Sequence, residues 1–215
     1  MSTDIDSIKR KLLIKYPTFG SVIANLEFQA SRDIQTAGTD GKVLLYNPKF
    51  LDRWNEKQQM FLLAHEICHV AFDHIYRSEG KDKELWNTAT DSVINALLKQ
   101  DGLPMIEGGV DIPEAINYDA EEMYNKLLEE KKKQEQQNSQ GNQGQQNSQD
   151  SQEKQNAQDR QGEQNSQSGQ EETDVGHDTH SLWDKAIEER KKEQQEQAEK
   201  KEKKERTDGE EQEEK

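Results

Sequence analysis

The chain has 215 residues, of which 29% are hydrophobic and 34% are charged, and its formal net charge is −15 at pH 7. Such values are typical of proteins with a large disordered fraction, and the negative charge disfavours binding to nucleic acid or to an anionic membrane. The sequence starts without the basic-then-apolar pattern of a signal peptide and has no apolar run near the roughly 20 residues that span a bilayer. Cys68 is the single cysteine, which excludes an internal disulfide. We therefore expect a soluble, cytoplasmic protein.

Almost all apolar residues lie in the first part of the chain, so we expect one folded domain over residues 1–131. Its patterns predict the α+β class, with several helices and a small β-hairpin or sheet. Helices are expected over about residues 4–16, 56–76, 84–100 and 120–131, and strands over about residues 26–30 and 42–46. Asn55 with Gln58, and Asp119 with Glu122, have the spacing of helix N-terminal caps.

The chain changes character past this domain. Residues 132–175 consist mostly of Gln, Asn, Ser and Glu with a nine-residue repeat, and because they have nothing to bury we expect a disordered linker. Residues 176–192 hold a short apolar island, expected to be helical, in which His177 and His180 should be solvated. Residues 193–215 form a charged tail, expected to be disordered or a solvated helix, which could bind a protein partner.

The expected helix over residues 56–76 contains His65-Glu66-Ile67-Cys68-His69, the HExxH pattern. Residues four apart on a helix are offset by about 40°, so His65 and His69 can both bind one zinc ion. Glu66 is offset by about 100°, where it can take a proton from a metal-activated water without ligating the metal. A different interpretation is that both histidines are hydrogen-bonded core residues and that Glu66 pairs with one of them. Cys68 is expected to be a small core residue.

A catalytic zinc usually has three protein ligands. His74 lies about 180° around the same helix from His65, so we expect it to be a helix-end residue near the negative end of the helix dipole. Asp91 on the next helix is the better candidate, because a buried aspartate needs a partner and the two helices can pack antiparallel. It could instead be a buried cap or hydrogen-bond partner. Asn87 and Asn95 share its polar row at i−4 and i+4, where they can orient the ligands.

Three blocks, TDGKVLLYNPKF, LLAHEICHVAFDH and LWNTATDSVINALL, occur in this order. Together they resemble the HExxH, zincin-like metallopeptidase domain of a family of bacterial and phage proteins that usually carries a C-terminal von Willebrand A-like domain. The resemblance implies a zinc ion at His65 and His69, an acidic third ligand at Asp91, and Glu66 as the catalytic residue. This chain departs from the pattern after the linker, where GHDTHSLWDKA resembles only the short element that often opens the second half.

The resemblance also implies that one strand borders the cleft, where an extended peptide would add as a further strand. The residues of that strand are Val43, Leu44, Leu45 and Tyr46. The predicted function is therefore a zinc-dependent peptidase acting on a peptide or protein substrate, with Tyr118 as a candidate for stabilising the transition state. Two alternatives remain open: a catalytically inactive, zinc-stabilised interaction module, and a metal-free helical scaffold.

Overall fold

The computed structural model describes residues 3–141 and 179–213, and it places side chains up to residue 137 and from 182 to 201. The described part is mostly helical with a small sheet, which confirms the predicted class. The helices are α1 (Ile5–Lys15), α2 (Gly20–Asn25), α3 (Pro48–Leu51), α4 (Glu56–Ala71), α5 (His74–Arg77), α6 (Lys83–Gln100), α7 (Ala120–Gly141) and α8 (Thr179–Glu213), with 3₁₀ turns at Pro17–Phe19 and Pro113–Asn117.

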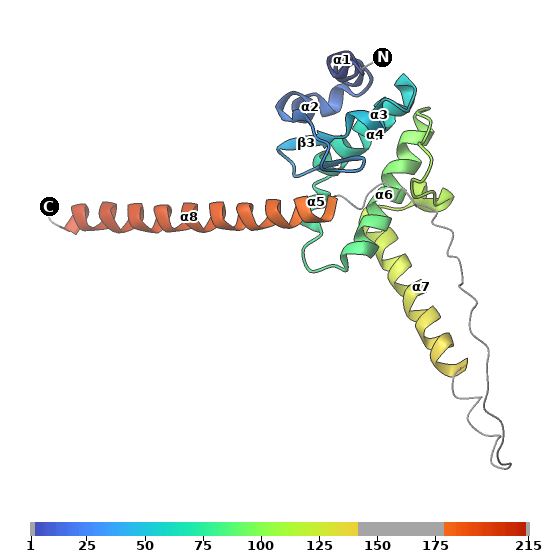
Figure 1. Ribbon diagram of the computed structural model, residues 1–215. Helices are drawn as coiled ribbons and strands as arrows, with labels where there is room; N and C mark the ends of the chain where they lie inside the picture. Colours follow the sequence, from blue (N-terminus) through green and yellow to red (C-terminus); the bar gives the residue numbers. More distant parts are fainter. Residues whose placement is uncertain (1–2, 142–178, 214–215) are drawn as a thin grey trace, which may run out of the picture.

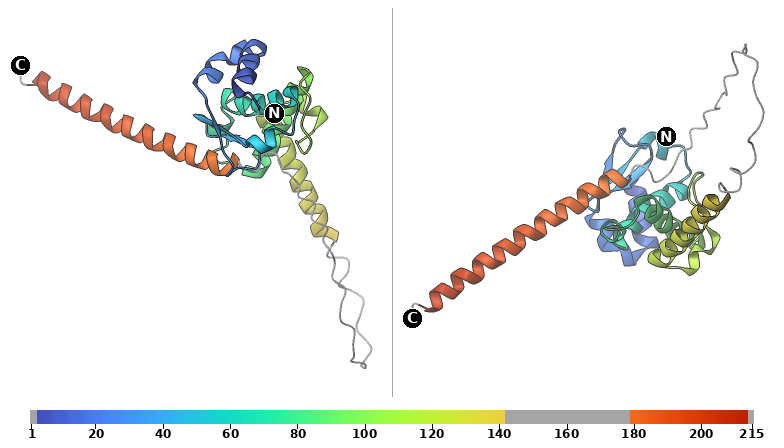
Figure 2. Two further views of the ribbon diagram at one scale, coloured as in Figure 1. Left: turned by 45° about the horizontal axis from the view of Figure 1, so that its top comes forward. Right: turned by 90° about the horizontal axis from the view of Figure 1, so that it is seen from below.

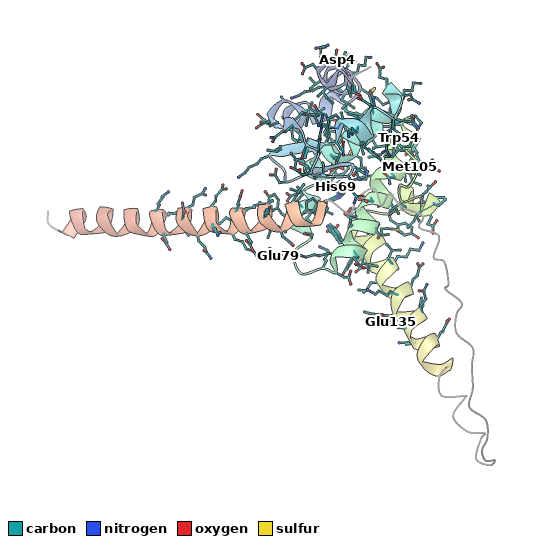
Figure 3. All side chains as sticks on the ribbon, in the orientation of Figure 1. Asp4, Trp54, His69, Glu79, Met105 and Glu135 are labelled. Carbon is teal, nitrogen blue, oxygen red and sulfur yellow. The ribbon has the colours of Figure 1, made fainter. Side chains whose placement is uncertain are left out.

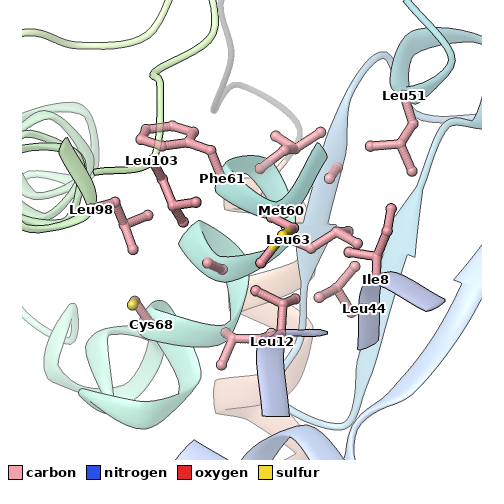
Figure 4. Packing of buried hydrophobic residues seen from close by; sticks show 14 of the residues in the cluster. Ile8, Leu12, Leu44, Leu51, Met60, Phe61, Leu63, Cys68, Leu98 and Leu103 are labelled. Carbon is pink, nitrogen blue, oxygen red and sulfur yellow. The ribbon is translucent and has the colours of Figure 1, made fainter. Parts of the chain in front are cut away.

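Helix α4 lies at the centre of the main hydrophobic core (Figure 4). Ten consecutive residues, from Met60 to His69, are buried, which is why this helix lacks a clean polar face. It begins at the predicted capping box, in which Asn55 and Gln58 each accept a hydrogen bond from the other's backbone N–H. Cys68 is buried in this core, as expected, and burial raises the pKa of its thiol to about 12. The core therefore holds the HExxH helix rigidly from several sides.

The sheet has three strands in the order β1 (Glu27–Ala30), β3 (Val43–Tyr46), β2 (Ala37–Thr39). β3 pairs parallel with β1 and antiparallel with β2. The expectation that a peptide adds along β3 is therefore wrong, because partners already occupy both hydrogen-bonding edges of that strand. β2 was missed by the sequence analysis; it enters a tight turn whose Gly41 has φ 91. β2 is an edge of the sheet and packs against α4.

The predicted helix over residues 56–76 is two helices. α4 ends at Ala71, and Asp73 adopts the left-handed conformation with φ 58, so the chain changes direction before α5 begins at His74. The expectation that His74 lies opposite His65 on one continuous helix is consequently wrong. His74 is instead buried, at the start of α5, and its backbone carbonyl accepts a hydrogen bond of 3.0 Å from Trp86 Nε1.

The last two helices leave the helical body in different directions, as the views agree (Figures 1 and 2). α7 begins at the predicted Asp119–Glu122 cap and continues to Gly141, past the expected end near residue 131. α8 starts beside α5 and extends outward as one long rod, through the regions expected to be an island and a charged tail. The expected linker beyond Gly141, with most of its nine-residue repeat, lies outside the described residues. So do His177 of the expected island and the side chain of His180.

None of the helices in the described ranges combines the length and the apolar character needed to cross a membrane.

Candidate metal centre

The structure brings His65 and His69 of α4 together with Asp91 of α6. His65 Nε2 lies 3.0 Å from His69 Nε2, and Asp91 Oδ1 lies 3.1 Å from His69 Nε2 and 3.5 Å from His65 Nε2. With metal–ligand bonds of about 2.1 Å, the edge of a tetrahedral zinc site is about 3.4 Å long. The three donor atoms therefore already form a triangle of nearly the size that a zinc ion requires. We call these three residues the metal cluster.

Asn95, one turn further along α6, determines which nitrogen of His65 faces the metal cluster. The Asn95 side-chain N–H donates to the Val110 carbonyl at 2.9 Å, which turns its Oδ1 towards His65 Nδ1 at 2.8 Å. Because a carbonyl oxygen only accepts, His65 Nδ1 must carry a proton. His65 Nε2 then has a free lone pair whenever the ring is neutral. Three acceptor atoms thus converge on one buried point, an arrangement that needs a cation or a proton at its centre.

Without a metal ion, that position holds a proton. Burial alone would lower the pKa of His65, but the hydrogen bond and charge of Asp91 raise it to about 9. Burial lowers the pKa of His69, which is therefore neutral at pH 7. Burial would raise the pKa of Asp91, yet both imidazoles hold it well below its usual range, so the aspartate is ionised. A divalent cation would replace this one shared proton. Two neutral imidazoles and a carboxylate would then bind the cation.

Glu66 lies next to the metal cluster in the sequence and is 3% exposed. Its Oε2 has no hydrogen-bond partner among the described residues. Burial raises the pKa of the Glu66 carboxyl to about 7; His65 opposes this shift and Asp91 adds to it. A buried, unpaired carboxyl with a pKa near neutrality can both accept and return a proton at physiological pH.

Two further residues contact the metal cluster. Asn87 Nδ2 donates to Asp91 Oδ2 at 3.3 Å, so the predicted polar row Asn87, Asp91 and Asn95 does gather at one place. His74 Nδ1 lies 3.4 Å from His69 Nδ1, on the side of the ring away from the metal cluster. Burial lowers the pKa of His74 to about 2, so this imidazole stays neutral and can share one proton with His69. The sequence analysis missed this role because no signal there indicates the break after Ala71.

Trp183 of α8 is the other residue that the sequence analysis missed. Its ring centroid lies 5.2 Å from that of His69, with the rings inclined at 64°, and its side chain is 2% exposed. Figure 3 shows His69 beside the first turns of α8. The available signal was the island itself, since Leu182, Trp183, Ala186 and Ile187 have the spacing of one apolar helix face within an otherwise polar region.

The fold and the metal cluster together define a helical domain built around a buried group that could hold a metal ion. The sequence model of a protein family described as "Putative metallopeptidase domain" matches residues 1–212. The chain therefore belongs to this family, which confirms the resemblance noted in the sequence. No finding tests the von Willebrand A-like domain that the resemblance attributes to the family. A search of curated proteins and a search of solved structures found no match to the chain.

Proposed function

We propose that the protein is a zinc-dependent peptidase that hydrolyses peptide bonds. The observation that carries this proposal is the triangle of donor atoms from His65, His69 and Asp91. The buried carboxyl of Glu66 interacts electrostatically with two of them, and its Oε2 has no hydrogen-bond partner among the described residues. Two imidazoles and one carboxylate are a common ligand set for catalytic zinc, which keeps one coordination position for water or substrate. The donors fit zinc in type and spacing, and only His65 must lose a proton before zinc binds.

The bound ion would supply Lewis acidity, lowering the pKa of a water molecule and polarising the carbonyl of the scissile bond. Glu66 would accept the proton of the attacking water and return it to the leaving amine, which its pKa of about 7 permits. Asn95 holds the lone pair of His65 towards the metal cluster, and Asn87 holds the Asp91 carboxylate. These fixed orientations reduce the reorganisation needed when the metal binds.

The substrate of the proposed reaction is a peptide or protein in extended conformation. β2 is an edge strand and packs against α4, so it is the strand along which such a peptide could add next to the metal cluster. Tyr118, the candidate from the sequence for stabilising the transition state, packs with Ala89, Ala115 and Met123 in a separate cluster. The proposal therefore assigns it no catalytic role.

The test is substitution of Glu66 by Gln in the full chain loaded with zinc. We expect zinc to bind as in the wild type, because Glu66 is not a ligand, while the rate of cleavage of a mixed peptide substrate falls by about 10²- to 10⁴-fold. Glu56→Gln, at the exposed start of the same helix, is the matched control and should leave the rate unchanged. An equal, chelator-sensitive rate in the Glu66→Gln protein would contradict the mechanism.

A second candidate function is a zinc-stabilised interaction module without turnover. The observation in its favour is burial: His65, Glu66, His69 and Asp91 are all 6% exposed or less. A module of this kind would bind zinc and a protein partner normally after Glu66→Gln. Mass spectrometry of the peptide mixture distinguishes the two candidates, since only the peptidase produces cleavage products that the wild type makes and the variant does not.

A further inference from the structure

The metal cluster and Glu66 are closed to a macromolecular substrate in this structure. Peptide hydrolysis requires the scissile carbonyl to come within contact distance of these groups, yet the most exposed of them, His65, is only 6% accessible. If the proposed function holds, some element must therefore leave the site before a peptide can enter. The contacts of α8 identify that element.

The first turns of α8 pack directly beside the metal cluster through one apolar face, which we call the docking face: Leu182, Trp183, Ala186 and Ile187. Trp183 contacts the His69 ring and shares a hydrophobic cluster with Ile75 and Trp86. Helix α8 also packs against β2, the edge strand along which we expect the peptide to lie. Helix α8 thus lies against both His69 and the edge strand of the sheet.

Ion pairs surround the docking face. Lys83 of α6 lies 2.6 Å from Asp184, Glu79 lies 2.6 Å from Lys191, and Lys42 lies 3.3 Å from Glu193. Each of these side chains is more than half exposed, so each pair contributes little and is screened by salt. These ion pairs orient α8 relative to the rest of the domain but contribute little to the stability of its packing.

The apolar contact is small as well. From Glu188 to Lys201 every side chain of α8 is exposed, so the helix buries apolar side chains only in its first turns. Helix α8 is held by these four apolar side chains, by the exposed ion pairs and by Arg190, whose guanidinium lies 4.0 Å from the centroid of the Tyr76 ring. So few contacts place it in the weakly held part of the structure, which can detach without unfolding the core.

We propose that the start of α8, residues 182–191, is an autoinhibitory cover that blocks the metal cluster and must detach before substrate binds. This inference rests on the proposed peptidase function for its consequence, but the covering itself can be measured independently of catalysis. Detachment opens both the edge of β2 and the side of His69 at once. Access to the metal and access of the peptide should therefore change together.

The first experiment uses Trp183→Ala in the zinc-loaded full chain. Loss of the aromatic anchor should raise the open fraction, so we expect the rate of zinc transfer to an excess of chelator and the rate of peptide cleavage each to rise at least about tenfold. Trp54→Ala, which removes a tryptophan that packs on Phe50 in the main core, is the matched control and should change neither rate comparably. Circular dichroism checks that both variants remain folded.

The second experiment tests whether α8 covers the metal cluster or only packs on the His69 ring. Lys83 lies at the start of α6, about two helical turns before Asp91, and its side chain is 57% exposed. Lys83→Glu places a like charge opposite Asp184, so both rates should rise by about threefold at low salt. The double variant Lys83→Glu with Asp184→Lys restores an attractive pair and should return both rates to the wild-type values. Failure of this restoration, or unchanged zinc transfer in both Trp183→Ala and Lys83→Glu, would overturn the proposal.

The two proposals fail in different ways. Faster zinc transfer without any cleavage in the open variants would support the cover and contradict the peptidase function. Wild-type cleavage that Glu66→Gln abolishes and that neither Trp183→Ala nor Lys83→Glu accelerates would support the peptidase and contradict the cover.

Discussion

His65 decides whether the metal cluster holds a proton or a cation. Its Nδ1 is bonded to Asn95, so the second proton of the ring sits on Nε2, where Asp91 stabilises it. The neutral His69 and the ionised Asp91 need no deprotonation before they bind a metal. The proposed metal ion would therefore displace one proton, and that proton would come from His65.

This competition predicts how zinc affinity depends on pH. Because the pKa of His65 is raised to about 9, protons compete with zinc up to that pH. The apparent affinity should rise about tenfold per pH unit from pH 7 to above pH 8, since one proton is released per ion bound. Competition titrations against a chelator of known affinity measure this slope. An affinity that levels off just above pH 7 would indicate an ordinary histidine and would contradict the proton-sharing arrangement.

At the scale of the element, the break between α4 and α5 gives the metal cluster its support. A continuous helix would carry His74 away from His69, but the left-handed Asp73 redirects the chain so that the two imidazoles meet. Aspartate tolerates this conformation better than most residues because its short side chain can bond locally, whereas a β-branched residue does not. The break therefore depends on the residue type at position 73.

Substitutions at Asp73 test this dependence. Asp73→Val should lower the free energy of unfolding by about 1 to 3 kcal/mol, because a β-branched side chain is strained at positive φ. Asp73→Asn removes the same charge, and with it the exposed pair with Arg190, but keeps a residue suited to the conformation, so it should be nearly neutral. Urea unfolding of both variants measures the difference. Equal stabilities would show that the backbone at this position is not a constraint.

At the scale of the whole molecule, we expect the hydrophobic core to hold α4 and α6 together even without a metal ion in the metal cluster. The largest buried cluster joins α1, α2, the sheet, α3, α4 and α6 through apolar side chains, with Ile94 and Leu98 as the contribution of α6. The metal cluster lies where α4 meets α6, next to a second, smaller cluster that includes Trp183. Removing the metal should therefore lower the free energy of unfolding, but the hydrophobic core should remain folded.

Thermal unfolding with and without zinc tests this expectation. At zinc concentrations of about one hundred times the dissociation constant, the bound ion should add about 2.7 kcal/mol to the stability, while the metal-free chain still unfolds cooperatively at a lower temperature. His69→Ala should abolish the zinc-dependent shift. Complete loss of structure on chelation would instead favour the zinc-stabilised interaction module.

Local patterns in the sequence determined the features that depend on neighbouring residues. The HExxH spacing placed two imidazoles on one face of a helix, the caps at Asn55 and Asp119 marked where helices begin, and the polar row through Asp91 pointed to a partner for the histidines. These predictions succeed because helix geometry relates residues three to eight positions apart almost independently of the rest of the molecule.

Only the tertiary structure decided what distant segments do. The central position of β3, the left-handed turn at Asp73 and the packing of Trp183 on His69 each depend on which surfaces remain to be buried once α4 is in the core. The spacing of neighbouring residues does not indicate which of these surfaces become buried. That outcome depends on the free energy of contacts between segments far apart in the chain. The three residues of the metal cluster could thus be predicted from the sequence, whereas the packing of α8 beside them could not.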